Sequence, residues 1–336
     1  MHNADFITKE AVVLKIIFLF ISLATLLFSK QIIRFSYVVS PNTPKGIAVD
    51  FFAKRVHELS KGEIEVRSYP NAQLYNDRAV IKALRYNSIQ MAAPSFSKFT
   101  SIIPQLQILD LPFLFRDEEH LHKTLDGNVG DHLKSLVEKK GIKALFFWDS
   151  GFKQLSSSKG ALIEPKDAQG LKFRIMSSKV LEAQFESVGA SAQVLPFSEV
   201  YSALEQGVID AVENPLSNFY TKKFYEAQSD LTISNHGYLG SLVVMSKRFY
   251  EKLPSNLQDV VVQALNETTM MQRKLVQKMD EEYLQKLQEY AKKSSKLKIH
   301  YLNNEQRDKW KYKMSEIYAE FYDVIGEDII KKCSFK

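Results

Sequence analysis

The sequence is poor in cysteine, because Cys333 is the only one among 336 residues. A single thiol excludes a disulfide framework, and it excludes structural zinc and iron–sulfur sites, which need clustered thiolates. A chain of this length buries a full core without such cross-links. Glycine and proline are also few, 13 and 10 residues, which excludes a collagen-like or low-complexity chain. At roughly 150 residues per domain, the length predicts about two domains or lobes.

The chain also lacks a concentration of charge of one sign. It has 45 basic and 39 acidic residues, a formal net charge of +6, and its basic residues are spread along the chain. A nucleic-acid binder gathers basic residues on one face or in an arm, beside aromatic side chains that stack on bases. We therefore expect no nucleic-acid partner. A small anionic ligand is compatible with this charge balance.

Long hydrophobic runs are absent except near the start, where the uncharged residues Ile16 to Phe28 follow Lys9 and Lys15. A membrane span needs roughly 20 apolar residues, so this shorter run predicts a secretory signal peptide at residues 1–29, removed near Ser29. The alternative is an uncleaved anchor in which Lys15 snorkels to the membrane surface. The residues before Lys30 also depart from the small-x-small pattern of a cleavage site.

Enzymatic motifs are missing as well. The sequence contains no G-x-G-x-x-G, no Walker A pattern, no G-x-S-x-G and no H-E-x-x-H. His120 and His122 are two residues apart, so on a helix they point in different directions and cannot chelate one metal together. We therefore predict no catalytic residues, no metal site and no cofactor. The alternative, a two-lobed periplasmic enzyme, would need a catalytic dyad that the sequence does not reveal.

What the sequence does contain is an alternation of strand and helix from Ile32 onward, which predicts an α/β fold with a largely parallel sheet. Thr43 followed by proline predicts a capped helix start. Ser255 and Gln258 predict a capping box on a helix that continues to about Lys292. At about 1.5 Å per residue this helix is too long for one small lobe, so we expect it to span two lobes that close around a cleft. Separate strands are predicted at 142–148, 152–157, 230–235 and 238–246.

Three polar residues stand at or near the ends of predicted strands in the expected second lobe. Arg174 lies near the end of GLKFRIM, where open α/β sheets place ligands, and its guanidinium matches a carboxylate with two prongs. Asn214 ends IDAVEN and can both donate and accept hydrogen bonds. Lys153, in SGFKQLSSS, adds a charge. The plain alternatives are a surface salt bridge for Arg174 and a turn residue before Pro215 for Asn214. Their joint placement favours an anion site.

Residues 170–220, GLKFRIMSSKVLEAQFESVGASAQVLPFSEVYSALEQGVIDAVENPLSNFY, resemble the core signature of the solute receptors of TRAP (tripartite ATP-independent periplasmic) transporters, the DctP family. YPNAQLYNDRAVIKAL and LQILDLPFLF are similar to first-lobe motifs of that family, and the resemblance extends roughly from Ile32 to Gly326. NTPKG, APSFSKF, GFKQ and FRIMSSKVLEAQF are similar to the branch that binds four-carbon dicarboxylates.

The resemblance implies a two-lobed periplasmic-binding-protein-like fold, with a mostly parallel sheet flanked by helices in each lobe. It implies lobe I at 32–149 plus 240–279 and lobe II at 150–239 plus 280–336. The implied function is a periplasmic receptor that captures a small carboxylate by cleft closure, with succinate, malate and fumarate as the expected ligands. The implied partners are the small and large subunits of a sodium-coupled membrane permease. The alternative within the family is another organic acid, a sugar acid or a 2-oxo acid.

The resemblance also implies six ligand-binding residues: Arg174, Asn214, Phe197, Lys153, Lys45 and Ser95. Lys45 and Ser95 fall on first-lobe positions, and Lys45 is the candidate for the distal carboxylate, because a four-carbon diacid needs a second cation. Met176 stands where the dicarboxylate branch is expected to carry a polar residue.

Overall fold

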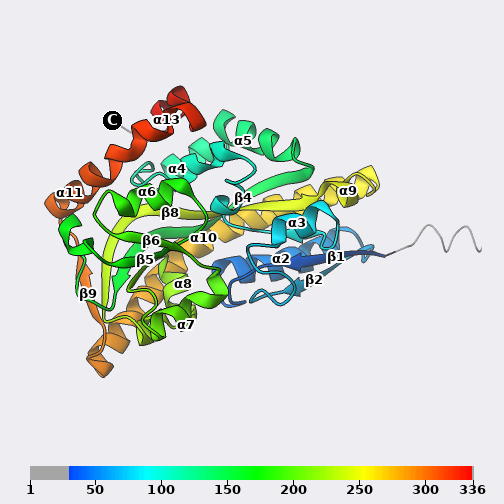
Figure 1. The fold of residues 1–336 in the computed structure, drawn as a ribbon. Helices are drawn as coiled ribbons and strands as arrows, with labels where there is room; N and C mark the ends of the chain where they lie inside the picture. The colour runs from blue at the N-terminus through cyan, green and yellow to red at the C-terminus, as the bar shows by residue number, and fades with distance from the viewer. Residues whose placement is uncertain (1–29, 335–336) are drawn as a thin grey trace, which may run out of the picture.

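The computed structural model describes residues 30–334 (Figure 1). The expected signal peptide at 1–29 lies outside the described residues. Among those that are described, nine strands form one sheet in the order β2-β1-β3-β8-β4-β7-β5-β6, and β9 pairs with β8. The strands are β1 (Gln31–Ser36), β2 (Ile64–Tyr69), β3 (Met91–Ala92), β4 (Ile142–Ser157), β5 (Lys172–Ile175), β6 (Ser191–Val194), β7 (Ala211–Asn214), β8 (Asp230–Ser246) and β9 (Lys298–Tyr301).

Two parallel groups of strands lie on either side of a long antiparallel pair. On one side β1 runs parallel to β2 and β3, and on the other β5 runs parallel to β6 and β7. Between them β8 is antiparallel to β3 and β4, and β4 is antiparallel to β7. This arrangement confirms the predicted two-lobed α/β fold, with both lobes sharing the long pair.

The long pair corrects one detail of the sequence analysis. The four separate strands predicted there are two continuous ones, β4 with 16 residues and β8 with 17. Their pairing runs from Ile142 opposite Ser246 to Ser157 opposite Asp230, and the register shifts between Asp149 and Gly151. Gly151 has a φ of +107°, a conformation open to glycine at little cost. The glycine that suggested a strand end is therefore part of a bulge inside one strand.

Helices cover both faces of this sheet (Figure 1). The α-helices are α2 (Pro44–Leu59), α3 (Val80–Arg85), α4 (Glu118–Leu125), α5 (Asn128–Glu138), α6 (Lys179–Glu186), α7 (Val200–Glu205), α8 (Leu216–Thr221), α9 (Lys247–Tyr250), α10 (Ser255–Ser294), α11 (Asn304–Ser315), α12 (Tyr322–Ile325) and α13 (Glu327–Cys333). Short 3-10 helices are η1 (Phe96–Lys98), η2 (Pro104–Asp110), η3 (Pro165–Ala168), η4 (Phe197–Glu199), η5 (Phe224–Glu226) and η6 (Glu316–Phe321). Among the helices of residues 30–334, none is both long enough and apolar enough to cross a membrane.

The long helix α10 is confirmed, and its 40 residues extend over about 60 Å. It packs against α2, β4 and α8, and so contacts elements on both sides of the long strand pair. The predicted capping box at its start is wrong. Pro254 occupies the N-cap position, so Ser255 is already the first helical residue, and Gln258 donates to the Leu253 carbonyl instead. The cap predicted for α2 is confirmed, because the Thr43 hydroxyl accepts from the Gly46 amide.

Candidate functional site

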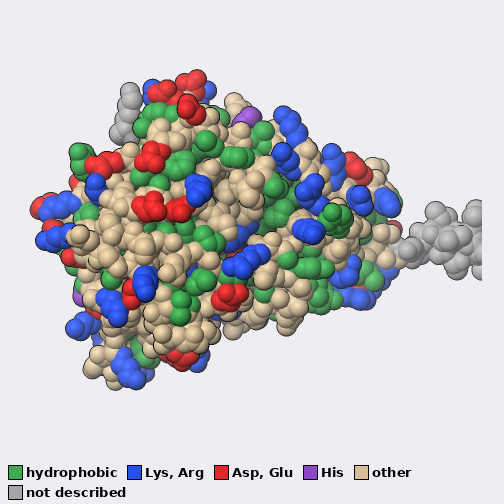
Figure 2. All heavy atoms as spheres, in the orientation of Figure 1, with side chains coloured by type: hydrophobic (Ala, Val, Ile, Leu, Met, Phe, Trp, Pro, Cys, Tyr) green, Lys and Arg blue, Asp and Glu red, His purple; other side chains and the backbone are tan. Residues whose placement is uncertain are grey.

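Basic and acidic side chains are scattered over the face shown in Figure 2, without a large patch of one sign. A group of charged side chains is instead buried in the interior, around a cavity. A cavity of about 50 Å³ lies between the two groups of parallel strands. A water molecule needs at least about 10–15 Å³ of such space, so the cavity is large enough to be occupied. All six residues predicted for the site line it, namely Arg174, Asn214, Phe197, Lys153, Lys45 and Ser95.

Arg174 is fixed at the end of β5 by its own neighbourhood. Its Nε and Nη2 both donate to the Leu195 carbonyl, at 3.0 and 2.8 Å, and its guanidinium carbon lies 5.8 Å from the centre of the Phe197 ring. Only 3% of the residue is exposed. No described residue accepts from Nη1 or pairs with Arg174 as an ion, so the surface salt bridge considered as its alternative role is not found among residues 30–334. One edge of the guanidinium is anchored and the other is available to a ligand.

Burial lowers the pKa of Arg174 to about 10, with Asp77 and Glu213 opposing this shift. The guanidinium therefore keeps its charge at neutral pH without a neutralising partner in contact with it. A buried, unpaired cation is unfavourable, so an anion that enters this cavity gains from a charge that is already desolvated and oriented.

Asn214 offers a second unused donor. Its Oδ1 accepts from Asn218 Nδ2 at 3.4 Å, while its own Nδ2 is buried and has no partner within the described part of the chain. The Ser36 hydroxyl, which also lines the cavity, is buried in the same way. A buried polar group without a partner costs about 1–3 kcal/mol, and a ligand oxygen accepting from Nδ2 would remove that cost.

Lys153 lines the cavity, but its charge has a partner that the sequence did not reveal. Its Nζ lies 2.6 Å from Glu213 Oε1, and Lys153 is 0% exposed. Glu213 Oε2 accepts from Gln184 Nε2 at 3.0 Å and lies 2.9 Å from His236 Nε2. Burial raises the pKa of Glu213, but Lys153 and His236 together outweigh burial and lower it. Sequence reasoning missed Glu213, although it precedes Asn214 in IDAVEN and also lines the cavity.

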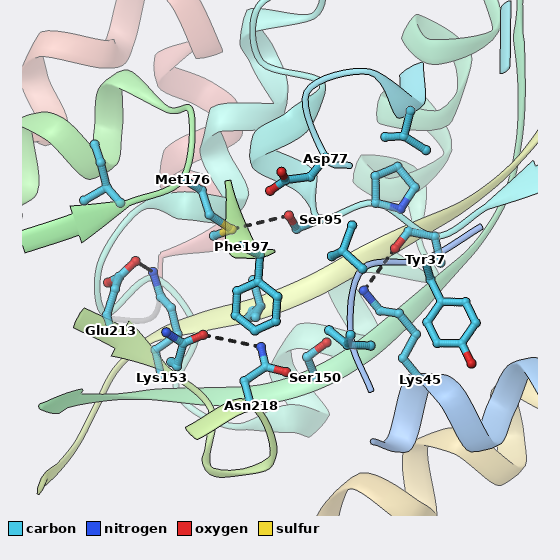
Figure 3. Close-up of a pocket in the computed structure, with 18 of the residues that line it drawn as sticks. Tyr37, Lys45, Asp77, Ser95, Ser150, Lys153, Met176, Phe197, Glu213 and Asn218 are labelled. Carbon is cyan, nitrogen blue, oxygen red and sulfur yellow. Dashed lines mark hydrogen bonds and ion pairs between the residues drawn. The ribbon is translucent and has the colours of Figure 1, made fainter. Parts of the chain in front are cut away.

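The opposite wall of the cavity carries Lys45, in the first turn of α2. Its Nζ donates to the Ala93 carbonyl at 3.0 Å, and burial lowers its pKa to about 8, with Asp77 opposing the shift. Asp77 Oδ2 lies 3.0 Å from Lys98 Nζ, and both side chains are buried. Asp77 and Lys98 were not predicted for the site, although Lys98 follows Ser95 in the same motif. Figure 3 shows Lys45 and Lys153 on opposite sides of Phe197.

Ser95 and Met176 bridge the two sides of the cavity directly. The Ser95 hydroxyl donates to the Met176 sulfur at 3.3 Å (Figure 3). Nearby, the Thr100 hydroxyl donates to the Ser177 carbonyl at 2.8 Å, and Lys179 N donates to Gln107 Oε1 at 3.1 Å. Elements that follow β3 and elements that follow β5 are therefore in contact, and the cleft between them is closed in this structure.

The charges around the cavity are unbalanced. Its lining side chains comprise three cations, Lys45, Lys153 and Arg174, and two carboxylates, Asp77 and Glu213. Asp77 pairs with Lys98, and Glu213 pairs with Lys153. Lys45 and Arg174 therefore remain as two lining cations that no carboxylate among residues 30–334 pairs with. Within residues 30–334 no group of three or more His, Cys, Asp or Glu side chains is arranged to hold a metal ion. The arrangement can neutralise a small anion carrying two negative charges.

Comparisons with known proteins agree with this geometry. The family model DctP, described as bacterial extracellular solute-binding protein, family 7, matches residues 35–324. The C4-dicarboxylate-binding periplasmic protein DctP of Rhodobacter capsulatus is 40% identical over 300 residues, 89% of each chain. A TRAP periplasmic solute-binding protein of Sulfurospirillum deleyianum, solved with bound succinate, is 58% identical with a TM-score of 0.89, covering 91% of this chain and 98% of that one.

A third similar structure carries a different kind of acid. The sugar acid binding protein DctPAm of Advenella mimigardefordensis, solved in complex with galactonate, is 33% identical with a TM-score of 0.87, covering 91% of this chain and 97% of that one.

Proposed function

Because the chain belongs to family 7 of the bacterial extracellular solute-binding proteins, we propose that it is the periplasmic receptor of a TRAP transporter for four-carbon dicarboxylates such as succinate, malate and fumarate. The observation that carries this proposal is a cavity lined by two cations without a carboxylate partner, Arg174 and Lys45, and by an unused donor on Asn214. A dicarboxylate gives each of the two cations a carboxylate partner.

In this proposal the two carboxylates have different binding partners. One carboxylate accepts from the free edge of Arg174 and from Asn214 Nδ2. Phe197 covers the carbon chain that joins the two carboxylates. The other lies toward Lys45, whose ammonium is on the opposite wall. Ser95 contributes its hydroxyl on that side. Lys153 adds positive potential to the cavity, which its ion pair with Glu213 reduces.

The choice of a four-carbon acid over the alternative rests on charge and on the relatives. The two lining cations without a carboxylate partner match the two carboxylates of a four-carbon diacid, whereas a sugar acid such as galactonate carries one carboxylate. The relatives named for C4-dicarboxylates and solved with succinate support the same choice. A sugar acid or a 2-oxo acid is the alternative that the binding experiment must exclude.

Ligand capture in this proposal is a closure of two lobes, lobe I at 32–149 plus 240–279 and lobe II at 150–239 plus 280–336. The crossings lie near Asp149 and Leu239, and the bulge at Gly151 supports a hinge there because the regular strand pairing is interrupted. The closed receptor then delivers its ligand to the small and large permease subunits in the membrane. Removal of the leader near Ser29 releases the receptor into the periplasm, and N-terminal sequencing of the exported protein is expected to begin near Lys30.

The proposal is tested by thermal unfolding and calorimetry of the exported form with succinate, malate, fumarate, galactonate and pyruvate. A ligand at one hundred times its Kd adds about 2.7 kcal/mol to the free energy of unfolding. We expect the four-carbon diacids to stabilise the protein most and to be recovered unchanged. A larger effect from galactonate or pyruvate selects the alternative ligand class, and turnover of any acid refutes the receptor.

A further inference from the structure

Lys222 is a cation that stands apart from the cavity lining. It follows α8, the short helix that starts two residues after Asn214, and its Nζ lies 5.5 Å from the centre of the Phe197 ring. Burial lowers the pKa of Lys222, and no carboxylate among residues 30–334 pairs with it. The polar contact that the described residues give its ammonium is Asn71 Oδ1, at 3.2 Å.

The Phe197 ring thus has two cations near it. Arg174, whose guanidinium carbon lies 5.8 Å from the ring centre, lines the cavity, and Lys222 does not. A cation over an aromatic ring gains about 0.5–2 kcal/mol, and more when it is poorly hydrated. Phe197 is therefore held through Lys222 as well as through its own packing against Phe224.

Asn71 belongs to the other side of the cleft. It follows β2 in a turn where Asn71 and Ala72 both have positive φ, 52° and 61°. The Asn71 amide donates to the Val39 carbonyl and the Ala72 amide donates to the Tyr37 carbonyl, so the turn is tied to two residues that line the opposite cavity wall. The bond from Lys222 to Asn71 therefore joins the two walls through residues 151 positions apart in the chain.

We propose that Lys222 is a positioning residue for ligand retention, which holds the cleft closed through Asn71 and keeps Phe197 against the ligand without touching the ligand itself. This inference rests on the proposed receptor function. The bond between Lys222 and Asn71 forms only when the two walls of the cleft meet. Its loss therefore speeds release of the ligand from the closed cleft and leaves the rate of ligand association with the open cleft unchanged. A single charge-assisted bond at a partly exposed site predicts a rise in koff of about 3- to 10-fold, or roughly 0.7–1.4 kcal/mol.

The experiment measures succinate association and release by stopped-flow fluorescence. Lys222→Met keeps the apolar stem and removes the donor, whereas Asn71→Gly removes the acceptor and tolerates the positive φ. Lys223→Met is the matched control, because Lys223 is the exposed neighbour and pairs locally with Glu226. We expect koff to rise about 3- to 10-fold in each single variant, kon to stay constant, and Lys222→Arg to restore slow release.

The double variant of Lys222→Met with Asn71→Gly decides whether the two residues act through one bond. We expect it to release succinate no faster than the single variants, because a shared interaction can be lost only once. Additive effects of the two substitutions on koff, or an unchanged koff in the single variants, overturn the proposal. A fall in kon as large as the expected rise in koff also overturns it, because Lys222 would then act by attracting the anion from a distance.

If the wild-type protein binds none of the acids in calorimetry, the receptor function is refuted. The hydrogen bond between Lys222 and Asn71 is then tested without a ligand. Spin labels at Lys54→Cys on α2 and Gln206→Cys after α7 then report the distance between the two sides in the ligand-free protein. We expect Lys222→Met to lengthen that distance distribution and Lys223→Met to leave it unchanged. Identical distributions for all three proteins overturn the positioning role.

Discussion

Replacing Arg174 is the sharpest test of the proposed ligand site. The guanidinium uses Nε and Nη2 to bind the Leu195 carbonyl, which leaves the edge formed by Nη1 and the second hydrogen of Nη2 for a carboxylate. Arg174→Lys keeps the charge but cannot make both sets of bonds, because an ammonium is a compact donor without a planar fork. Arg174→Ala removes the charge as well.

The magnitude follows from burial. The residue is 3% exposed and no carboxylate in the described part of the chain contacts it, so a bound ligand carboxylate would lose its main partner inside a closed cavity. Truncating one member of such a pair costs roughly 2–5 kcal/mol, which is about 30-fold to several-thousand-fold in affinity. We expect Arg174→Ala to lie in this range and Arg174→Lys to lose at least about tenfold, or 1.4 kcal/mol.

The assay is calorimetric Kd for the acid that binds wild-type protein best, with circular dichroism to confirm that each variant is folded. Arg248→Lys, at an exposed position on α9, is the matched control and is expected to bind like wild type. If folded Arg174→Lys binds within about threefold of wild type, under 1 kcal/mol, the two-pronged contact is wrong and Arg174 serves to hold Leu195.

Three further outcomes are expected. Burial lowers the pKa of Lys45 to about 8, so raising the pH from about 7 to about 9 removes its charge and weakens succinate binding, whereas Lys45→Met gives weaker binding with a flatter profile by calorimetry. Lys153→Met leaves Glu213 buried without its ion partner and is expected to lower the free energy of urea unfolding by roughly 3–5 kcal/mol, most of which Lys153→Met with Glu213→Gln recovers. Saturating ligand is expected to reduce the radius of gyration in solution scattering, and an unchanged profile contradicts closure of the lobes.

Local patterns in the sequence were sufficient for several parts of the fold. The spacing of Val261, Leu265 and Val276 predicted the buried stripe of α10, and all three are fully buried. Helical periodicity depends on residues three and four apart, so it can be detected without knowing what the helix packs against. The start of α2 at Thr43 was predictable for the same reason, because a cap involves only its own first turn.

Strand continuity was not predictable in this way. The glycine at 151 indicated an end to the strand, yet β4 continues through it because β8 supplies partners on both sides of the bulge. Whether a glycine ends a strand or bends it depends on the neighbouring strand, which lies about 90 residues away in the chain.

The sequence by itself determined which polar residues to examine, because motif resemblance pointed to Arg174, Asn214 and Lys45, and strand-end position pointed to the first two as well. Only the tertiary structure decided how they are charged and paired. Glu213 faces Lys153 across 60 positions of sequence, and Lys222 reaches Asn71 across 151. The strength of such contacts depends on burial and on the approach of distant walls, and no local pattern of residues encodes either quantity.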